Sequence, residues 1–208
     1  MASVKGPTRK EKAAATRRRM LDAAYELFAE QGFRATTMEV IAERAGVAVQ
    51  TLYFTFHTKD ELLQAVQDRA VLGDDPVPPH QQEFHRALMT ARRLEESVRH
   101  FATGNATICR RVAPLTPTLH EVAGDPAGEV WRRSEELRKD GYAGIVTYWS
   151  TKVVLRLDLP KHRAVDLLLV LAGPDVYRML VLEKSWSHDA YVDWLTGAIL
   201  HDLFGRRS

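Results

Sequence analysis

Cysteine is almost absent from this sequence. Cys109 is the only thiol among the 208 residues, which excludes an internal disulfide framework and a cysteine-based metal site. No apolar run approaches the roughly 18 residues that a membrane-spanning helix needs, and the basic N-terminus lacks the apolar segment of a secretory signal. With 45% apolar and 27% charged residues, we expect a globular, cytoplasmic protein.

Motifs of catalysis are absent as well. The chain contains no Gly-x-Ser-x-Gly, no His-Glu-x-x-His, no phosphate-binding glycine loop and no dinucleotide fingerprint. Its eight histidines are scattered, without the spacing of metal ligands. We therefore predict that the protein is not an enzyme and binds neither a metal nor a cofactor. The alternative is an enzyme on a helical fold that uses His100 or His120.

Positive charge is concentrated at one end. Residues 1–20 contain seven Lys or Arg and a single Glu, so they carry a charge of about +6, while the rest of the chain carries about −4. This asymmetry suits a polyanionic partner at one end of the protein. The alternative is a solvated tail. Residues 1–15 lack periodicity and are predicted to be a disordered basic arm.

Helical periodicity dominates the remainder. We predict an all-α protein of about nine or ten helices, with a three-helix N-terminal domain at residues 16–73 and a C-terminal domain at residues 74–208. The stretch GDDPVPPHQ, rich in Pro and Asp, marks the boundary. Residues 153–159 have strand propensity, but a strand without a partner is unstable, so a helix end and a loop are predicted there. Later helices are expected over about 82–89, 93–111, 126–153, 161–184 and 187–204.

Two short helices joined by a glycine turn end the first domain. They span residues 37–56, with the turn at Gly46 and a capping box formed by Thr36 and Glu39 before the first helix. Short helix, turn and short helix is the plan of a helix-turn-helix, whose second helix enters the major groove. The side chains expected to be buried between the helices are Ile41, Ala42, Val47, Leu52 and Phe56.

The second helix carries TLYFTF, whose residues favour a strand by propensity. A strand would need a sheet, and nothing nearby supplies one, so we predict a helix held by the packing of Leu52 and Phe56. Its outer face then offers Gln50 and Thr51 for base edges and Tyr53 for phosphate oxygens. An ordinary helical hairpin is the alternative interpretation.

The segment Thr16–Gly73 closely resembles the DNA-binding domain of tetracycline-repressor-type (TetR) transcriptional regulators. The resemblance rests on LFAEQGF, TTMEVIAERAGV, TLY-x-TF and KDELL, which occur in this order. Residues 173–195 resemble the C-terminal dimer helices of many family members. The family implies a homodimer on a palindromic operator in double-stranded DNA and a C-terminal domain that binds a small-molecule effector.

The resemblance also implies which side chains contact DNA. Thr37 would contact a backbone phosphate, and Tyr53 and Lys59 would hold phosphates. An arm with Arg17 and Arg18 would lie over the DNA backbone or in the minor groove. The groove face would be lined by Val49, Gln50, Thr51 and Thr55.

Three positions depart from the family pattern. Ala48 stands where the family commonly has Ser or Thr as the N-cap, and alanine caps a helix less well by roughly 1 kcal/mol. Val49 and Gln50 replace the common Lys and Gly. The operator sequence therefore cannot be inherited from relatives.

The C-terminal helices are apolar nearly all round. Residues 167–171 are all Leu or Val, and the apolar residues of 192–203 also exceed one helix face. Such helices must be buried on more than one side. A four-helix interface between two copies explains this pattern, with a deeply buried central helix as the alternative.

The middle helices supply candidates for an effector pocket, although core packing is the alternative for each of them. Their composition favours an apolar or aromatic ligand. We predict a repressor that a small molecule releases from its operator. An effector-independent activator or architectural DNA-binding protein of the same fold is the alternative. The pocket candidates are Phe101, Asn105, Ile108, Trp131, Tyr142, Ile145 and Trp149.

Overall fold

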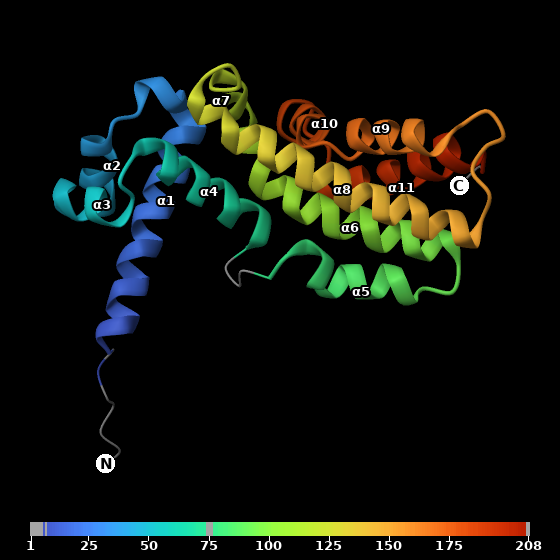
Figure 1. Cartoon of the computed structure of the whole chain (residues 1–208), viewed down its shortest axis with the longest axis horizontal. Coiled ribbons are helices and arrows are strands. Elements are labelled where there is room, and N and C mark those ends of the chain that lie inside the picture. Colours follow the sequence, from blue (N-terminus) through green and yellow to red (C-terminus); the bar gives the residue numbers. More distant parts are fainter. Residues whose placement is uncertain (1–5, 7, 74–76, 207–208) are drawn as a thin grey trace, which may run out of the picture. The chain divides into compact units, whose positions relative to one another are not determined.

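The structure is a computed structural model that describes residue 6 and residues 8–73 and 77–206. These residues form helices and no strand (Figure 1), which confirms the all-α prediction. None of the described helices is both long and apolar enough to span a membrane. The α-helices of the described part are α1 (Arg9–Ala35), α2 (Met38–Ala45), α3 (Val49–Thr55), α4 (Lys59–Leu72), α5 (Glu83–Thr90), α6 (Leu94–Val112), α7 (Thr116–Glu121), α8 (Glu129–Lys152), α9 (Lys161–Leu171), α10 (Pro174–Tyr177) and α11 (His188–Phe204).

The chain divides into two compact units. The first contains the described residues up to Asp68 and takes in a later segment, Pro117–Val130. The second contains Arg69–Thr116 and the described residues from Trp131 onward. The boundary predicted after residue 73 is therefore a few residues late, and the return of the chain to the first unit was missed. The reason is that the Pro-rich stretch ends α4, whereas the boundary between the units falls inside that helix.

The N-terminal arm is helical from Arg9 onward. The Thr8 hydroxyl accepts a hydrogen bond from the Glu11 amide, and the Glu11 carboxylate accepts one from the Thr8 amide at 2.6 Å. This capping box is followed by three alanines, the strongest helix formers. The prediction of a disordered arm is therefore wrong for residues 9–15. Residues 1–5 and 7 lie outside the described part.

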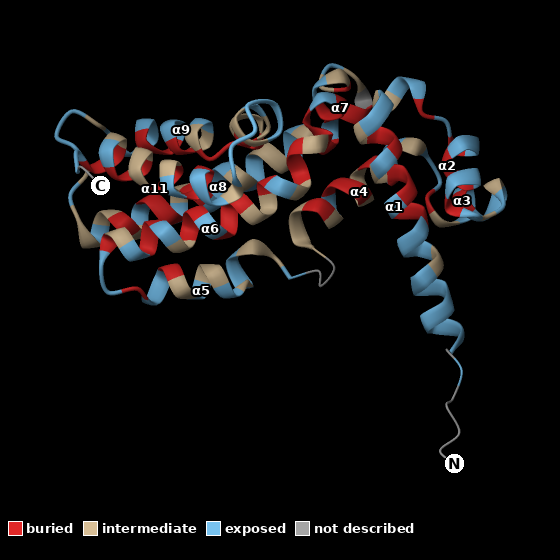
Figure 2. Ribbon diagram, turned by 180° about the vertical axis from the view of Figure 1, so that it is seen from behind, coloured by how far each residue is buried: buried red, intermediate tan, exposed pale blue. Residues whose placement is uncertain are grey.

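The first unit has its own apolar core. Only the part of α1 from Met20 onward contributes to it, while the preceding turns are exposed and drawn in pale blue in Figure 2. α2 packs against α1, and α3 packs against α2. The main buried side chains of this core are Met20, Leu27, Phe28, Met38, Ile41, Ala42, Leu52, Leu62, Leu63 and Val66.

The second unit is built around α6, which packs against both α5 and α11. The buried residues of α6 form a stripe that includes Val98, Phe101 and Ala102. The ring of Phe101 meets those of Tyr142 and Trp149 edge to face, with centroids 5.3 and 5.4 Å apart. Such pairs contribute beyond the area that they bury.

The helix predicted over residues 161–184 is interrupted. α9 ends at Leu171, and Pro174 opens α10 after the extended Gly173. Proline has no amide to continue a helix from the preceding turn, which explains the break. The chain then forms a π-helical turn at Arg178–Glu183. The loop predicted over residues 153–159 is confirmed.

A methyl group added at Gly104 has no room. A Cβ atom built there would lie 2.1 Å from Cγ of Phe84, so α5 would have to move away from α6. Gly104→Ala should therefore lower the free energy of unfolding by about 1–3 kcal/mol, measured by urea denaturation. Gly144→Ala, which meets no atom within 4 Å, is the matched control and should stabilise α8 by about 0.5–1 kcal/mol. Equal stabilities of the two variants would contradict this packing.

Candidate nucleic-acid interface

The turn between α2 and α3 has the geometry of a helix-turn-helix. α2 ends at Gly46, whose φ of 64° and ψ of 44° lie in the left-handed region that glycine tolerates best. The Val47 amide donates to the Ala42 carbonyl at 3.0 Å and closes the turn. The predicted pair of helices is confirmed.

Thr37, and not Thr36, is the N-cap of α2. The exposed Thr37 hydroxyl accepts from the Val40 amide at 3.3 Å, so the N-cap lies one residue later than predicted. The residue three positions on is then Val40, which cannot complete a capping box as Glu39 was expected to do. Thr36 is fully buried, and its hydroxyl donates to the Gly32 carbonyl at 2.7 Å. Gly32 adopts a φ of 82°, which turns the chain out of the α1 helix and directs Thr36 inward.

Two buried side chains hold α3 as a helix. Leu52 is fully buried, and Phe56 at its C-cap is nearly so. They share the core with Ile41 and Ala42 of α2. This packing outweighs the poor helix propensity of the segment, and the helix is confirmed over the strand. Val47, predicted in the same set, is only half-buried.

The outward face of α3 carries no charge. Gln50 and Thr51 are exposed, Tyr53 is 43% exposed and Phe54 is 86% exposed. The face therefore presents an amide, two hydroxyls and two aromatic rings. None of these groups would repel a phosphate backbone.

The other two predicted groove residues are less accessible. Val49 and Thr55 are both half-buried. The Thr55 hydroxyl donates to the Thr51 carbonyl at 2.8 Å, one helical turn earlier. Thr55 therefore presents mainly its methyl group and its oxygen lone pairs to a partner.

The basic residues predicted for the arm lie on a helix. Arg17 and Arg18 are exposed on α1. The Arg17 guanidinium lies over the ring of Phe56, 4.4 Å from its centroid, a cation–π contact. A positive charge is thereby placed beside the C-terminal end of α3.

Lys59 is drawn into the protein. Its ammonium donates to the carbonyls of Phe33 and Thr36 at 2.8 and 2.9 Å and lies 4.1 Å from the centroid of the Phe33 ring. Partial burial lowers the pKa of this ammonium. Two of its three N–H donors bind the turn before α2, so at most one remains for the phosphate contact that the resemblance implies.

Glu121 belongs to this site, although the sequence did not point to it. Its carboxylate accepts from the amides of Phe33 and Arg34, at 2.8 and 3.1 Å, directly after the turn at Gly32. These amides have left the helical ladder of α1 and need acceptors. Glu121 is 88 positions from Phe33, so no local pattern could have shown the contact.

Residues 20–66 match the family model described as bacterial regulatory proteins, tetR family. The matched span contains α2, the turn at Gly46 and α3. This N-terminal segment of the chain is therefore similar to the tetR family. The family resemblance drawn from the sequence is thereby confirmed.

Two transcriptional regulators illustrate how far the tetR-family match extends. UidR of Escherichia coli is 40% identical over 60 residues, which are 27% of this chain and 31% of UidR. SrpR of Pseudomonas putida is 47% identical over 51 residues, 24% of either chain. The chain thus matches about a quarter to a third of the length of these relatives.

Solved structures extend the likeness of fold to nearly the whole chain. NalD of Pseudomonas aeruginosa has a TM-score of 0.66 and 21% identity, covering 92% of this chain and 98% of NalD. A protein from Saccharomonospora viridis, solved in complex with choline, has a TM-score of 0.69 and 20% identity, covering 93% of this chain and all of that chain. At these identities the likeness concerns the fold alone.

Five of the seven predicted effector residues lie in the core of the second unit. They are closely packed, and four of them belong to one apolar cluster. Ile108 and Trp131, the other two, are half-buried. The five buried residues are Phe101, Asn105, Tyr142, Ile145 and Trp149.

Asn105 is the centre of a polar network within this apolar core. Its Nδ2 donates to the Ala172 carbonyl at 2.9 Å, and its Oδ1 accepts from the Tyr142 hydroxyl at 2.6 Å. The Cys109 thiol also donates to the Ala172 carbonyl, at 3.6 Å. Burial raises the pKa of Cys109 to about 12, so the thiol stays protonated and unreactive.

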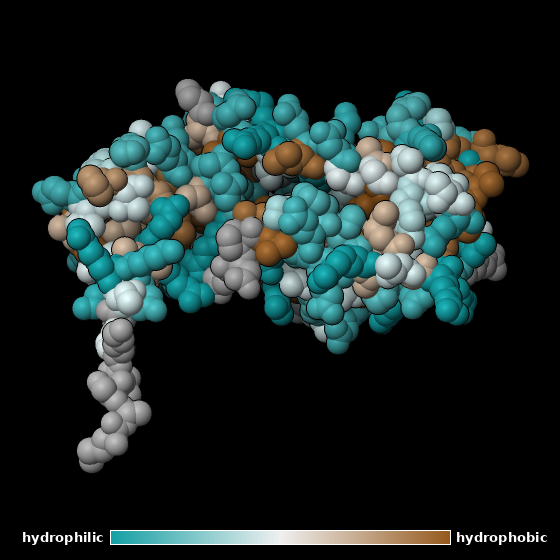
Figure 3. Space-filling view, turned by 60° about the horizontal axis from the view of Figure 1, so that its bottom comes forward, coloured by the Kyte–Doolittle hydropathy of each residue, from teal (hydrophilic) through white to brown (hydrophobic). Residues whose placement is uncertain are grey.

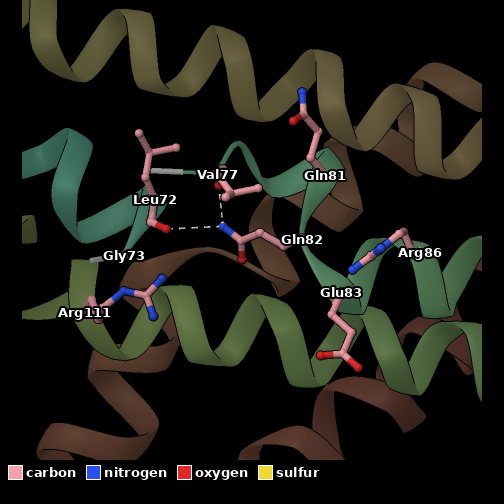
Figure 4. A pocket seen from close by; sticks show the side chains of 8 residues that line it. All are labelled: Leu72, Gly73, Val77, Gln81, Gln82, Glu83, Arg86 and Arg111. Atoms are coloured by element: carbon pink, nitrogen blue, oxygen red, sulfur yellow. Dashed lines mark hydrogen bonds between the residues drawn. The ribbon is translucent and has the colours of Figure 1, made fainter. Parts of the chain in front are cut away.

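A separate pocket of about 350 Å³ lies in the second unit, beside the end of α4 and the start of α5 (Figure 4). Gln82 reaches across one side of it, and its Nε2 donates to the carbonyls of Val77 and Leu72 at 2.8 and 3.4 Å. None of the seven predicted effector residues lines this pocket. Its lining consists of Leu72, Gly73, Val77, Gln81, Gln82, Glu83, Arg86 and Arg111.

Across the described residues, no three His, Cys, Asp or Glu side chains converge as potential metal ligands.

The missing cap of α3 gives a test of the interface. Ala48 makes no side-chain hydrogen bond to the first turn, so Ala48→Ser should supply an acceptor and raise the free energy of unfolding by about 1 kcal/mol. Ala14→Ser is the same change within the exposed part of α1. It should lower the free energy of unfolding by at most about 0.5 kcal/mol. Urea denaturation measures both. If Ala48→Ser is no more stable than the unchanged protein, the assignment of Ala48 as N-cap is wrong.

Proposed function

We propose that this chain is a sequence-specific DNA-binding transcriptional regulator. It acts as a repressor, binds a palindromic operator as a homodimer and is released by a small-molecule effector. The observation that carries the proposal is the exposed, uncharged face of α3, held by Leu52 and Phe56 inside a domain that matches the tetR family.

The exposed side chains of α3 have chemistry that fits the major groove. Gln50 can form two hydrogen bonds with an adenine edge, and the Thr51 methyl can contact a thymine methyl. The Tyr53 hydroxyl can donate to a phosphate oxygen. Thr37, at the start of α2, places its hydroxyl and the nearby helix amides where a phosphate is favoured.

The positive charge of α1 supports the same partner. Arg17 and Arg18 are exposed on the helix that packs against α2. Contacts between such side chains and phosphates release counterions, so affinity should fall steeply as salt rises. In this arrangement α1 lies against the DNA backbone, and Arg17 adds its charge next to α3.

Exposed apolar side chains in the second unit support a homodimer. α9 buries Leu168 but exposes Leu167 and Val170, the latter to 65%. The π-helical turn after α10 exposes Met179 and Leu182. Apolar residues on the outside of a globular unit mark an interface, and two-fold symmetry would pair these segments with their copies.

α11 contributes less to this interface than the sequence predicted. Its apolar residues pack within their own unit, while Trp194 and Ala198 remain half-buried. The alternative of a central buried helix therefore describes much of α11. The residues buried in this way are Val192, Leu195, Ile199 and Leu203.

Two solved structures support the repressor and effector parts of the proposal. NalD is the secondary repressor of the MexAB-OprM multidrug efflux pump, and the Saccharomonospora viridis protein is in complex with choline. In this chain, Lys59 joins the start of α4 to the turn before α2. A ligand-driven shift of α4 would move that turn and re-aim α3, which lowers operator affinity.

An effector-independent activator or architectural protein of the same fold is the second candidate, because the exposed face of α3 alone would serve it equally well. The two candidates differ in their response to ligands. A small molecule that binds only the folded state raises its melting temperature. Failure of every compound in a broad library to change the melting temperature would favour the second candidate.

A footprint on the DNA upstream of the protein's own gene tests the class of function. We expect protection of a palindrome whose half-site centres are about 34–36 Å, or a multiple of that distance, apart. Absence of any protected sequence, with folded and dimeric protein, would contradict the proposal.

Two substitutions on α3 separate base recognition from phosphate contact. Tyr53→Phe removes a phosphate donor and should weaken binding to all sequences by a similar factor, while Gln50→Ala should relax preference at one position per half-site by about 1–3 kcal/mol. Binding to a library of operator variants measures both. An unchanged sequence preference in Gln50→Ala would show that Gln50 does not face the bases.

The dimer interface is tested at α9. Val170→Asp places a charge among exposed apolar side chains and should shift the sedimentation of the full chain from dimer to monomer. Leu157→Asp is the matched control, since Leu157 is 103% exposed in the loop after α8. Figure 3 shows hydrophobic side chains gathered at the right-hand end of the view, where Figure 1 places that loop. If Leu157→Asp dissociates the dimer and Val170→Asp does not, the interface lies at the loop instead.

A further inference from the structure

One hydroxyl in the core of the second unit lacks a hydrogen-bond partner. Tyr191, in the first turn of α11, is fully buried, and its hydroxyl meets neither donor nor acceptor among the described residues. Buried hydroxyls are nearly always hydrogen-bonded, so an exception calls for an explanation.

Tyr191 lies beside the polar network at the break between α9 and α10. Burial raises its pKa, and the nearby Cys109 and Tyr142 raise it further. Those two neighbours are paired, since Cys109 donates to the Ala172 carbonyl and Tyr142 donates to Asn105. Tyr191 is therefore an unpaired hydroxyl beside two paired neighbours.

A second donor of this cluster is also unpaired. Arg138 of α8 donates through Nη1 to the Leu169 carbonyl at 3.0 Å and through Nη2 to Glu135 at 2.5 Å. Its Nε is buried and has no partner in the described part of the chain. Cζ of Arg138 lies 5.7 Å from the centroid of the Tyr142 ring, and its positive charge opposes the rise in the pKa of both Tyr142 and Tyr191.

Aromatic rings surround the unpaired hydroxyl. The ring centroids of Tyr177 and Trp194 lie 4.8 and 5.7 Å from that of Tyr191. The Tyr177 hydroxyl has its own partner, Nδ1 of His188, at 3.0 Å. The cluster therefore combines spare polar donors with apolar walls, as ligand sites commonly do.

The segment that follows the break is irregular. Ala172 and Gly173 interrupt the helix, and the π-helical turn at Arg178–Glu183 comes immediately after α10. π-helical turns are rare and are frequently found at functional sites. A ligand that enters here can rearrange a segment that is not a regular α-helix.

We propose that this cluster is the effector site and that its ligand carries a hydrogen-bond-accepting oxygen, such as a carbonyl, carboxylate or phenolate, on an aromatic or apolar body. The inference rests on the ligand-responsive function proposed above. The oxygen accepts from the Tyr191 hydroxyl and from Nε–H of Arg138, while Tyr177 and Trp194 contact the body. A cationic ligand is disfavoured because the Arg138 guanidinium is itself positively charged and its Nε–H can only donate.

The state of the Tyr191 hydroxyl can be tested without a ligand. Tyr191→Phe removes an unpaired hydroxyl and should leave Tm unchanged or raise it. Tyr142→Phe removes a hydroxyl bonded to Asn105 and should lower Tm by about 2–10 °C. Calorimetry of the full chain measures both. A fall in Tyr191→Phe as large as that in Tyr142→Phe would show that the hydroxyl is paired, for example by a buried water, and would overturn the proposal.

The ligand class is tested with four benzene derivatives of similar size. Acetophenone and benzoate carry an accepting oxygen, ethylbenzene carries none, and benzylamine is a cation. Ligand-observed NMR on the full chain without DNA should show acetophenone and benzoate binding about fivefold tighter than the other two. Tyr191→Phe should abolish this preference. Tyr177→Phe, which removes a hydroxyl already bonded to His188, should retain it.

Three binding results would likewise overturn the proposal: no binding of acetophenone or benzoate, equal binding of all four probes, or an unchanged preference in Tyr191→Phe. None of these measurements involves DNA. A chain that shows the preference but protects no DNA would keep the ligand site and refute the regulator. A chain that protects a palindrome but lacks the preference for an accepting oxygen would keep the DNA-binding regulator and refute the ligand site.

Discussion

The short turn between Gly32 and Thr36 positions the rest of the first unit. Gly32 leaves the helical conformation with a φ of 82°, so amides and carbonyls that α1 would have paired need other partners. Glu121 accepts from two of the amides, and Lys59 donates to two of the carbonyls. Charge-assisted hydrogen bonds of this kind are stronger than neutral ones. Since the turn sets where α2 begins and α3 packs on α2, the direction of the groove-facing side chains depends on these contacts.

The two faces of α3 have separate physical roles. Burial of Leu52 and of Phe56 stabilises by about 1.5–3 kcal/mol each. That exceeds the few tenths of a kcal/mol per residue that β-branched and aromatic residues cost in a helix, together with about 1 kcal/mol for the missing cap at Ala48. The inner face alone is therefore enough to keep the helix. The outer face, including the almost fully exposed Phe54, is free to differ between relatives without loss of the fold.

The second unit shows the opposite arrangement, a few polar groups inside an apolar core. Asn105 and Tyr142 bond to each other, and Asn105 bonds to the carbonyl of Ala172 at the break between α9 and α10. Buried polar groups that are fully paired make a core rigid and specific, whereas unpaired ones destabilise it. The unpaired hydroxyl of Tyr191 beside this network therefore marks the place where the core is incomplete by itself, and where a bound molecule would stabilise it most.

Local pattern in the sequence was sufficient for the all-α class and for the helix-turn-helix at residues 37–56, because each depends on residues within a few turns of one another. It missed the break before Pro174, where a continuous helix over residues 161–184 was expected. It was also sufficient for the family, through motifs that lie within residues 20–66. It misplaced the start of α1, where the capping box at Thr8 was overlooked. Only tertiary structure decided that Lys59 binds the turn before α2, that Glu121 returns to the first unit and that Tyr191 lacks a partner. The physical reason is that hydrogen bonds between distant segments depend on how helices pack, and side chains far apart in the chain carry no shared periodicity that would reveal them.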